Sequence, residues 1–347
     1  MKISAGIFGA SGYTGIELAR LLLEHPHAEL TALNSRAYAG GGYENLFGSL
    51  KSFTHLECEE SSIADFAERC DVVFLALPHG IAAKEINPSI LEKTLIVDLG
   101  ADYRLKDRKV YEQWYGITHE SPELIETAQY GLCELYREKI AGSPLIANPG
   151  CYTTASITAL APLYKEGIIE LQSTIIDAKS GVTGAGRTPS QALHFSECNE
   201  SIKAYKVEGH RHTPEIEQAL SECAGMDVIT RFTPHLVPMN RGILASCYAR
   251  PAIPVSSRGL HDLYERHYSG EPFIRLLEPG IYPHTRWVRG SNFIDISIDF
   301  DERSNTIVAL SALDNLVKGA AGQAVQNMNI HFGFEETEGL MQIPLFP

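Results

Sequence analysis

Long apolar runs, an excess of positive charge and closely spaced cysteine pairs are all missing from this 347-residue sequence. No apolar run reaches the roughly 18 residues that a membrane-spanning helix needs. The formal net charge of −14 argues against binding to nucleic acids or anionic membranes. A few local arginines or lysines could still form a pocket for an anionic small molecule. We therefore expect a small-molecule substrate, and neither a nucleic acid nor a membrane as a partner.

The cysteines do not indicate a disulfide framework or a metal site. Their number, 7, is odd, and no two of them form a Cys-x-x-Cys pair, which is a spacing typical of zinc and redox sites. Reduced thiols are typical of the cytosol. The segment "MKISAGIFGASGYTG" is too short in its apolar part for a signal peptide. We expect a cytoplasmic protein without a bound metal.

The pattern that remains predicts an α/β fold. In the first part of the chain, apolar runs such as "DVVFLALPHG" (71–80) and "TLIVDLGAD" (94–102) alternate with helical patterns. Continuous apolar runs are typical of strands buried on both faces, so this part predicts a Rossmann-type doubly wound parallel sheet. After about residue 165 the sequence becomes β-rich, which predicts an α+β catalytic domain with a mixed or antiparallel sheet.

A glycine-rich turn connects the first predicted strand to the first predicted helix. The segment "GASGYTG" places Gly9, Gly12 and Gly15 there, in the spacing G-x-x-G-x-x-G rather than the strict G-x-G-x-x-G. Glycines at such a turn let a phosphate approach the helix N-terminus, where N–H groups and the helix dipole favour anions. A tight turn without a ligand is the alternative, but the position between strand and helix favours a nucleotide site.

The end of the second predicted strand lacks the acidic residue that often binds the ribose of NAD. It reads "ALNSRAYAG", with Ser35 and Arg36 in the corresponding region. An arginine at this place suits a 2′-phosphate, so the sequence favours NADP over NAD. The alternative is a solvated arginine in a loop.

The last helical pattern, at 314–333, affects the expected domain boundaries. Its apolar residues recur at i, i+4 spacing, and Gly319 permits close approach to another element. We expect this helix to pack back onto the first domain. The sequence therefore predicts a discontinuous NADP-binding domain, 1–150 with 315–347, and a catalytic and dimerisation domain, 151–314.

The segment "LIANPGCYTT" places a cysteine directly after a Pro-Gly hinge. The hinge ends a predicted strand, and Cys151 lies at the start of the helix that follows. A helix N-terminus favours the thiolate form, and a thiolate attacks acyl groups with little further activation. A buried structural cysteine is the alternative. The carboxyl end of a parallel strand is, however, where α/β folds bind ligands, so Cys151 is the candidate nucleophile.

A proton carrier for this thiol is offered by the segment "VEGHRHTPEIEQAL". His210 and His212 precede a predicted helix for which Thr213 is a possible N-cap, and Glu215 or Glu217 could orient an imidazole. Histidines two residues apart in an extended loop point in roughly opposite directions, so only one is expected to reach the thiol. Two exposed loop histidines are the alternative.

Five segments together resemble a known family. They are "GASGYTGIELARLL", "ANPGCYTT", "KSGVTGAGR", "GHRHTPEIEQ" and "NLVKGAAGQAVQNMN". In this order, and through nearly the whole chain, they resemble the N-acetyl-γ-glutamyl-phosphate reductases of arginine biosynthesis. That family belongs to the wider group of aspartate-semialdehyde and glyceraldehyde-phosphate dehydrogenases. The cysteine and His-Arg-His segments carry the resemblance most specifically.

The resemblance implies an oxidoreductase that uses NADPH to reduce N-acetyl-L-glutamyl 5-phosphate to N-acetyl-L-glutamate 5-semialdehyde and phosphate. By this resemblance Cys151 is the nucleophile that forms a thioester. His210 matches the acid/base of the family better than His212 does, and Glu215 matches the acid that orients the histidine. Relatives of this kind associate as homodimers or homotetramers, which is therefore the expected assembly.

The resemblance also implies binding residues, and it adds no metal. The implied cofactor-binding residues are Gly9, Ser11, Gly12, Tyr13, Thr14, Gly15, Ser35, Arg36, Gly181 and Asn315. The implied substrate-binding residues are Arg104, Ser180, Arg187 and His212. The glycine-rich segment 180–187 is expected to cover the substrate or the nicotinamide.

Other functions remain open from the sequence. Another acyl-phosphate reductase, acting on aspartyl or aminoadipyl phosphate, would keep the cysteine and the glycine turn. A non-catalytic redox sensor would bind NADPH, but its turnover would not depend on Cys151. A thiol hydrolase would show no dependence on NADPH.

Overall fold

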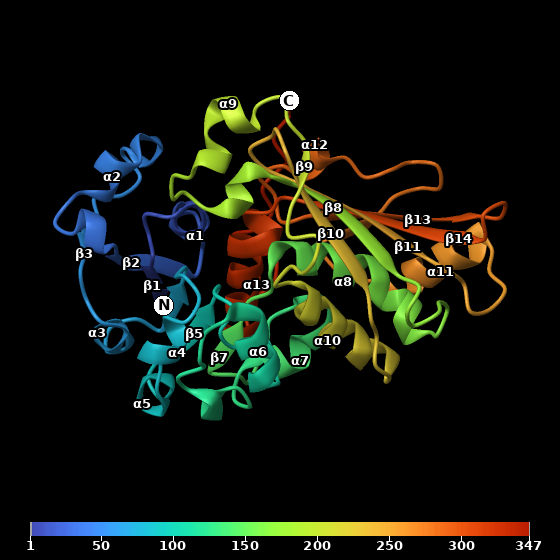
Figure 1. Ribbon diagram of the computed structural model, residues 1–347. Coiled ribbons are helices and arrows are strands. Elements are labelled where there is room, and N and C mark those ends of the chain that lie inside the picture. Colours follow the sequence, from blue (N-terminus) through green and yellow to red (C-terminus); the bar gives the residue numbers. More distant parts are fainter. Residues whose placement is uncertain (1, 347) are drawn as a thin grey trace. The chain divides into compact units, whose positions relative to one another are not determined.

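The computed structural model describes residues 2–346 and divides them into two compact units, each with its own sheet (Figure 1). The first unit holds the residues up to Gly150 together with Ala320–Gln342. The second unit holds Cys151–Gly319 together with the residues from Ile343 onward. The α/β prediction is confirmed, because one sheet is parallel and the other is mixed.

The first unit is built on a parallel sheet of 7 strands in the order β3-β2-β1-β4-β5-β7-β6. The strands are β1 (Ile3–Phe8), β2 (Ala28–Asn34), β3 (Cys58–Glu59), β4 (Val72–Leu75), β5 (Leu95–Asp98), β6 (Gln129–Tyr130) and β7 (Leu145–Ala147). Every residue of β4 and β5 is buried, as their continuous apolar runs predict. The strand order reverses at β1, between β2 and β4, and doubly wound sheets bind ligands at such a point.

The helices of the first unit include one that comes from the far end of the chain. They are α1 (Tyr13–Leu23), α2 (Tyr43–Leu46), α3 (Ile63–Ala67), α4 (Ala82–Glu85), α5 (Pro88–Leu91), α6 (Arg108–Tyr115), α7 (Cys133–Ile140) and α13 (Gly322–Phe332). Helix α13 contacts α1, α7 and β5. Its buried polar side chains hold it there. For example, the Asn327 amide donates to the carbonyl of Gly131 (2.9 Å) and to the Asn148 side chain (3.0 Å).

The segment predicted as a single helix at 314–333 begins with a π-helical turn, Val317–Ala321. The Asp314 side chain accepts from the N–H groups of Leu316 (2.9 Å) and Val317 (3.3 Å), and its carbonyl accepts from Gly319 (2.9 Å). That last bond spans five residues, which widens the turn. Side-chain bonding of this kind is not visible in apolar periodicity, so the sequence predicted a regular helix.

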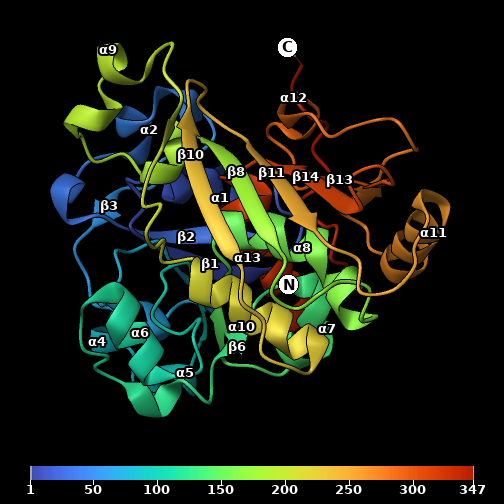
Figure 2. The same cartoon turned by 45° about the vertical axis from the view of Figure 1, so that its right-hand side comes forward.

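The second unit contains a mixed sheet of 7 strands in the order β12-β13-β14-β11-β8-β10-β9. The strands are β8 (Ile175–Gly181), β9 (Lys203–Ala204), β10 (Arg231–Val237), β11 (Ile243–Ala249), β12 (Ile274–Leu276), β13 (Ile294–Asp301) and β14 (Thr306–Leu313). Figure 2 shows β10, β8, β11 and β14 side by side. The β8–β10 and β12–β13 pairs are parallel, and the other pairs are antiparallel.

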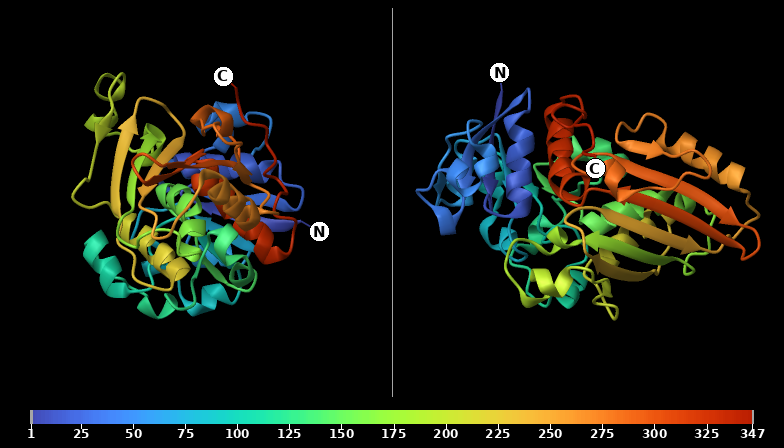
Figure 3. Two further views of the ribbon diagram at one scale, coloured as in Figure 1. Left: turned by 90° about the vertical axis from the view of Figure 1, so that its right-hand side faces the viewer. Right: turned by 90° about the horizontal axis from the view of Figure 1, so that it is seen from above.

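The helices of the second unit are α8 (Cys151–Lys165), α9 (Phe195–Cys198), α10 (Thr213–Ala224), α11 (Ser257–Tyr268) and α12 (Thr285–Val288). Helix α8 contacts β11, β14, α10 and α11, and it is buried continuously from Tyr152 to Tyr164. The β13–β14 hairpin, coloured orange to red, and α11 pack together (Figure 3). Among the described residues, no helix combines the length and the apolar character that crossing a membrane requires.

Candidate active site

Cys151 is the first residue of α8, so the helix predicted after the Pro-Gly hinge begins at the thiol itself. The residue is half-buried. Gly319, in the π-helical turn, packs closely against Cys151. A Cβ atom built on Gly319 would lie 2.8 Å from the Cys151 Cβ. Because real Cβ atoms do not approach so closely, glycine at this position lets the turn support the thiol-bearing residue.

His210 is enclosed by aromatic rings. Its ring makes edge-to-face contacts with Tyr152, Tyr205, Phe232 and His212, at centroid distances of 5.8, 5.6, 5.3 and 4.8 Å. Only 8% of the residue is exposed. The backbone N–H of His212 donates to its Nδ1 atom (3.1 Å). Burial, together with the nearby His212, lowers the pKa of His210 to about 2.

Tyr152 and Tyr205 are neighbours of both Cys151 and His210. The Tyr205 hydroxyl donates to the Tyr152 hydroxyl (3.3 Å), which donates to the carbonyl of His235 (3.1 Å). Burial raises the pKa of Tyr205 to about 12 and the pKa of Tyr152 further, and the charge of Cys151 adds to both increases. Both phenols therefore stay neutral, and both are electrostatic neighbours of Cys151 as well as ring neighbours of His210.

Neither tyrosine was singled out from the sequence. Tyr152 directly follows the cysteine in "GCYTT", and this adjacency could have drawn attention to it. Tyr205 is held by its N–H, which donates to the carbonyl of Pro234 on β10 (3.1 Å). That contact depends on the pairing of β9 with β10, so no local signal could have identified Tyr205.

Glu215 ties α10 to α8. It is 1% exposed, and its carboxylate accepts from the hydroxyl of Thr153 (2.8 Å) in the first turn of α8. The alternative acid, Glu217, accepts from the N–H of Thr230 (2.9 Å) instead. Burial raises the pKa of Glu217.

The prediction that Thr213 caps α10 is wrong, because the N-cap is His212 and Thr213 is already helical. The cause is a turn that precedes the helix. In that turn the N–H of Thr213 donates to the carbonyl of His210 (2.9 Å), so the backbone adopts helical dihedral angles one residue earlier than predicted.

The carboxyl end of β8 brings three of the expected binding residues together. Ser180 is buried, and its hydroxyl donates to the carbonyl of Gly181 (2.9 Å). The N–H of Gly181 donates to the carbonyl of Gly242 (2.9 Å). The Asn315 side chain accepts from the N–H of Gly242 (2.8 Å) and donates to the Thr183 hydroxyl (3.0 Å). The amide of Asn315 thus holds the two loops that border this strand end.

The structure places the two expected substrate arginines in different units. Arg187 is exposed on the segment that follows β8 in the second unit, directly after Gly186, which has a positive φ of 87°. Arg104 belongs to the first unit, where it is 6% exposed and donates to the carbonyl of Leu99 (2.9 Å). His212, the other expected substrate contact in the second unit, is half-buried beside His210.

The β1–α1 turn fits the phosphates of a dinucleotide. Gly9 has a positive φ of 80°, and a Cβ there would lie 2.2 Å from the carbonyl oxygen of Ala76. A Cβ on Gly15 would lie 2.5 Å from the carbonyl oxygen of Gly9. Gly12 is the N-cap of α1 and has no side chain to cap the helix. The N–H groups of the first turn, which includes Tyr13 and Thr14, are therefore left to an anion.

Ser35 and Arg36 follow β2, next to this turn. The Ser35 hydroxyl donates to the Ser11 hydroxyl (2.9 Å), which joins the loops after β1 and β2. The Arg36 side chain is 87% exposed and pairs with Glu60 (2.9 Å). Because an exposed ion pair contributes only about 0–1 kcal/mol, the guanidinium can exchange this partner for a phosphate at little cost.

Two buried aspartates lie near the carboxyl end of β5, and no motif pointed to them. Asp102 accepts from the N–H groups of Gly80 (2.7 Å) and Ala83 (3.0 Å) and from the Tyr111 hydroxyl (2.8 Å). Asp98 accepts from the N–H of Gly100 (2.8 Å). Burial, reinforced by the charge of Asp102, raises the pKa of Asp98 well above its ordinary range. The hydrogen bonds that Asp102 accepts from Gly80 and Ala83 fix the loop that follows β4.

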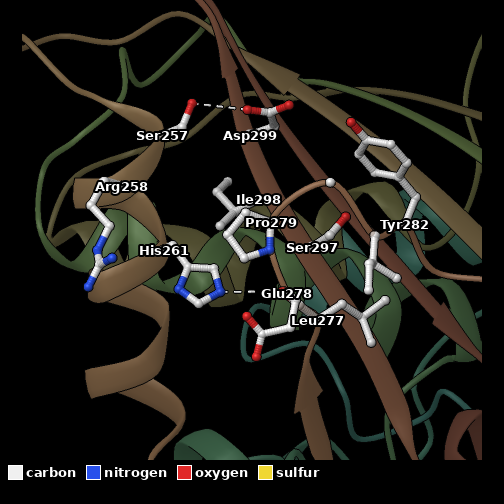
Figure 4. Close-up of a pocket in the computed structure, with 12 residues that line it drawn as sticks. Ser257, Arg258, His261, Leu277, Glu278, Pro279, Tyr282, Ser297, Ile298 and Asp299 are labelled. Atoms are coloured by element: carbon white, nitrogen blue, oxygen red, sulfur yellow. Dashed lines mark hydrogen bonds between the residues drawn. The ribbon is translucent and has the colours of Figure 1, made fainter.

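A cavity of about 230 Å³ lies in the second unit between α11 and the loop before β13 (Figure 4). The His261 ring donates from Nε2 to the carbonyl of Leu277 (3.3 Å), and the Ser257 hydroxyl donates to Asp299 (3.0 Å). None of the residues expected from the sequence to act in catalysis or binding lines this cavity.

Comparisons with known sequences cover both units. Residues 4–143 match the family model of the semialdehyde dehydrogenase NAD binding domain, and residues 151–315 match that of the semialdehyde dehydrogenase dimerisation domain. An N-acetyl-gamma-glutamyl-phosphate reductase from Desulforudis audaxviator is 50% identical over 99% of this chain and 100% of its own length. A reductase of the same name from Campylobacter jejuni is 52% identical over 98% of both chains.

Solved structures share the fold at low sequence identity. Aspartate semialdehyde dehydrogenase II from Vibrio cholerae, complexed with ASA, has a TM-score of 0.72 at 17% identity and covers 96% of this chain and 99% of its own. The aspartate semialdehyde dehydrogenase with NADP from Candida albicans has a TM-score of 0.69 at 18% identity, covering 95% and 98%. At such identities the likeness establishes the fold alone.

Proposed function

The chain belongs to the semialdehyde dehydrogenase family, among its N-acetyl-gamma-glutamyl-phosphate reductases, and from this premise we propose that it reduces N-acetyl-L-glutamyl 5-phosphate with NADPH. The products are N-acetyl-L-glutamate 5-semialdehyde and phosphate, in a step of arginine biosynthesis. The observation that carries the proposal is the half-buried Cys151 at the start of α8, which shares two tyrosine neighbours with His210. We place the enzyme in the cytoplasm as a homodimer or homotetramer.

NADPH supplies a hydride when it is bound. We assign its diphosphate to the N-terminus of α1, because the glycines of the β1–α1 turn leave backbone N–H groups without a side-chain cap. Its 2′-phosphate is assigned to Arg36 and the neighbouring Ser35. In the second unit, Gly181 and Asn315 are the proposed contacts near the nicotinamide, since they fix the end of β8.

Cys151 carries the acyl group through the reaction. Its sulfur attacks the carbonyl carbon of the acyl phosphate, and phosphate leaves with the electrons of the C–O bond. The product of this step is a thioester on Cys151, which accepts a hydride more readily than a carboxylate does. When the carbonyl has been reduced to the aldehyde level, the C–S bond breaks and the Cys151 thiolate is restored.

Negative charge develops on the carbonyl oxygen twice in this reaction, first when the thiol attacks and again when the thioester accepts the hydride. The N–H groups in the first turn of α8 are the proposed donors to that oxygen, together with His210. Losing one such donor typically costs about 3 kcal/mol of barrier. Glu215 is proposed to position the first turn of α8 through its hydrogen bond to Thr153. Arg104, Ser180, Arg187 and His212 remain the proposed contacts to the substrate.

The test of this function is phosphate-dependent oxidation of N-acetylglutamate semialdehyde with NADP, compared with aspartate semialdehyde under the same conditions. We expect kcat/KM for the acetylated substrate to exceed that for aspartate semialdehyde by about 10³-fold or more. The reason is that a pocket that hydrogen-bonds an acetamido group has unpaired polar groups when the substrate lacks this group. Preference for aspartate semialdehyde would favour the related acyl-phosphate reductases. Activity without NADP would favour a hydrolase.

Replacing Arg36 with alanine is expected to raise KM for NADPH by about tenfold or more, which corresponds to about 1.4 kcal/mol, and to leave KM for NADH unchanged. The reason is that only NADPH carries the 2′-phosphate that the guanidinium would bind. Steady-state kinetics with both cofactors measure the effect. Arg303→Ala is the control, because Arg303 is 88% exposed at the β13–β14 turn. Equal losses with NADPH and NADH would contradict the assignment.

A further inference from the structure

We propose that Asn148 positions the thiol of Cys151, because its side-chain amide joins the hinge before the thiol to the π-helical turn that packs against Cys151. This inference rests on the proposed function, in which Cys151 is the nucleophile, and deepens it. Asn148 touches neither the substrate nor the cofactor in the proposed mechanism. It acts through Cys151 and is therefore a positioning residue.

The hinge begins at Asn148, which directly follows β7 and is 1% exposed. The backbone N–H of Asn148 donates to the carbonyl of Asp98 at the end of β5 (2.8 Å). This bond ties the start of the hinge to the parallel sheet. The next residue, Pro149, has no N–H to donate, so the side chain of Asn148 supplies a bond that the main chain of Pro149 cannot.

The side chain of Asn148 reaches the π-helical turn. Its Nδ2 atom donates to the carbonyl of Ala320 (3.1 Å). Ala320 directly follows Gly319, and a Cβ atom on Gly319 would lie 2.8 Å from the Cβ of Cys151. Together with the covalent chain on either side, the hydrogen bond and the packing contact form a closed ring of contacts. Cys151 cannot shift relative to the turn without breaking one of them.

The orientation of the Asn148 amide is fixed from both sides. A main-chain carbonyl can only accept hydrogen bonds, so the NH2 group of Asn148 must face Ala320. The side-chain oxygen of Asn148 accepts from Nδ2 of Asn327 (3.0 Å), and this Nδ2 atom also donates to the carbonyl of Gly131 (2.9 Å). The Cys133 thiol donates to the side-chain oxygen of Asn327 (3.2 Å). These bonds leave the Asn148 amide a single orientation.

Burial makes the arrangement demanding. Asn148 and Asn327 are both buried, and buried amide groups are unfavourable unless they are hydrogen-bonded. An apolar side chain at position 148 would remove one partner each from Ala320 and Asn327. The hinge and the turn would then be free to move apart. A displacement of about 1 Å at a reacting group is enough to slow a reaction substantially, so the rate should respond to this one amide.

The first test compares Asn148→Ala with a matched control. Asn148→Ala should lower kcat by about 10- to 10²-fold, up to the cost of displacing a reacting group by about 1 Å, and leave KM for NADPH unchanged. Gln323→Ala is the control, because this buried amide of α13 donates elsewhere, to the carbonyl of Gly131 (2.7 Å) and the sulfur of Cys133 (2.9 Å).

Both variants lose buried hydrogen bonds, so both should melt several degrees early. Gln323→Ala should nevertheless keep kcat within about threefold of the wild type, since the ring of contacts around the thiol is intact. A wild-type kcat in Asn148→Ala would overturn the proposal. So would equal losses of kcat in the two variants, because the loss would then follow stability alone.

The second test asks whether Asn148 and Gly319 act through the same ring of contacts. The double variant Asn148→Ala with Gly319→Ala should turn over about threefold or more faster than the product of the two single losses predicts, because residues that share a contact are not additive. Losses that multiply exactly would show that the two residues act independently, and would overturn the proposal.

A third readout does not require turnover. Iodoacetamide alkylates the thiolate form of cysteine, so the pH dependence of its reaction with Cys151, followed by mass spectrometry, reports how well the helix start stabilises the thiolate. In Asn148→Ala the midpoint of this dependence should move to higher pH, because the sulfur leaves its place at the helix N-terminus. In Gln323→Ala the midpoint should stay where it is in the wild type.

An unchanged midpoint in Asn148→Ala would overturn the proposal. A midpoint that moves in Asn148→Ala, in a protein whose wild type does not oxidise N-acetylglutamate semialdehyde, would support the positioning role and count against the proposed function alone. The two failures are thus distinguishable.

Discussion

Replacing Cys151 with serine is expected to lower kcat by about 10⁴-fold or more. A rate loss of this size is typical when the nucleophile of a cooperating set of catalytic residues is removed. Serine keeps the size of the side chain and so preserves the packing against Gly319. The serine hydroxyl, however, is not ionised near neutral pH, and without a strong base it attacks an acyl phosphate poorly. Initial rates of NADPH oxidation with N-acetylglutamyl phosphate measure the effect.

Two controls make this result specific. Cys198→Ser, at a half-buried thiol on the short helix α9, should keep the wild-type rate. Cys151→Ser should also bind NADPH with unchanged affinity, because the proposed diphosphate and 2′-phosphate contacts belong to the first unit. Turnover that survives in Cys151→Ser, or after alkylation of Cys151, would rule out a thioester on this residue.

Gly319→Ala is expected to lower kcat by about 10²-fold, although residue 319 touches no substrate in the proposed mechanism. The added methyl group would lie 2.8 Å from the Cβ of Cys151 and 3.3 Å from the carbonyl oxygen of Asp314, so either the π-helical turn or the cysteine must move. A displacement of about 1 Å at a reacting group typically costs about 10²-fold in rate. Gly319→Val should be slower still, because its two further methyl groups need more room.

The measurement combines kcat with a melting temperature. Overpacking typically destabilises by about 1–3 kcal/mol, so the melting temperature of Gly319→Ala should fall by several degrees. Gly142→Ala is the matched control, because nothing lies within 4 Å of its added Cβ, and it should change neither quantity. A Gly319→Ala protein that melts early but turns over at the wild-type rate would show that the glycine serves packing alone.

The fold could be predicted where strands are buried on both faces. The runs at 71–80 and 94–102 contain β4 and β5, since a parallel sheet covered on both sides requires apolar residues at every position. The π-helical turn at Val317–Ala321 could not be predicted. It depends on hydrogen bonds from one buried aspartate, Asp314, to the backbone, whereas apolar periodicity reports only which face of a helix is buried.

The candidate site divides in the same way. Cys151 and the glycine turn were identifiable because each combines a chemical group with a local helix start. The contact between Tyr205 and His210 was not, because it depends on the pairing of β9, which directly precedes Tyr205, with β10, and no local pattern in the sequence indicates that pairing. The buried Asp98 was not identified either, since its raised pKa arises from burial and from the charge of Asp102, which only the folded structure brings close.

The donor that orients the His210 ring is a peptide amide, not the imidazole of residue 212. Every amino acid except proline carries that amide. A saturation series at position 212 would therefore replace the imidazole of residue 212, while the His210 ring keeps its tautomer. The contributions of two histidines only two residues apart can thus be separated by single-site substitution, and proline is the one replacement expected to disturb both at once.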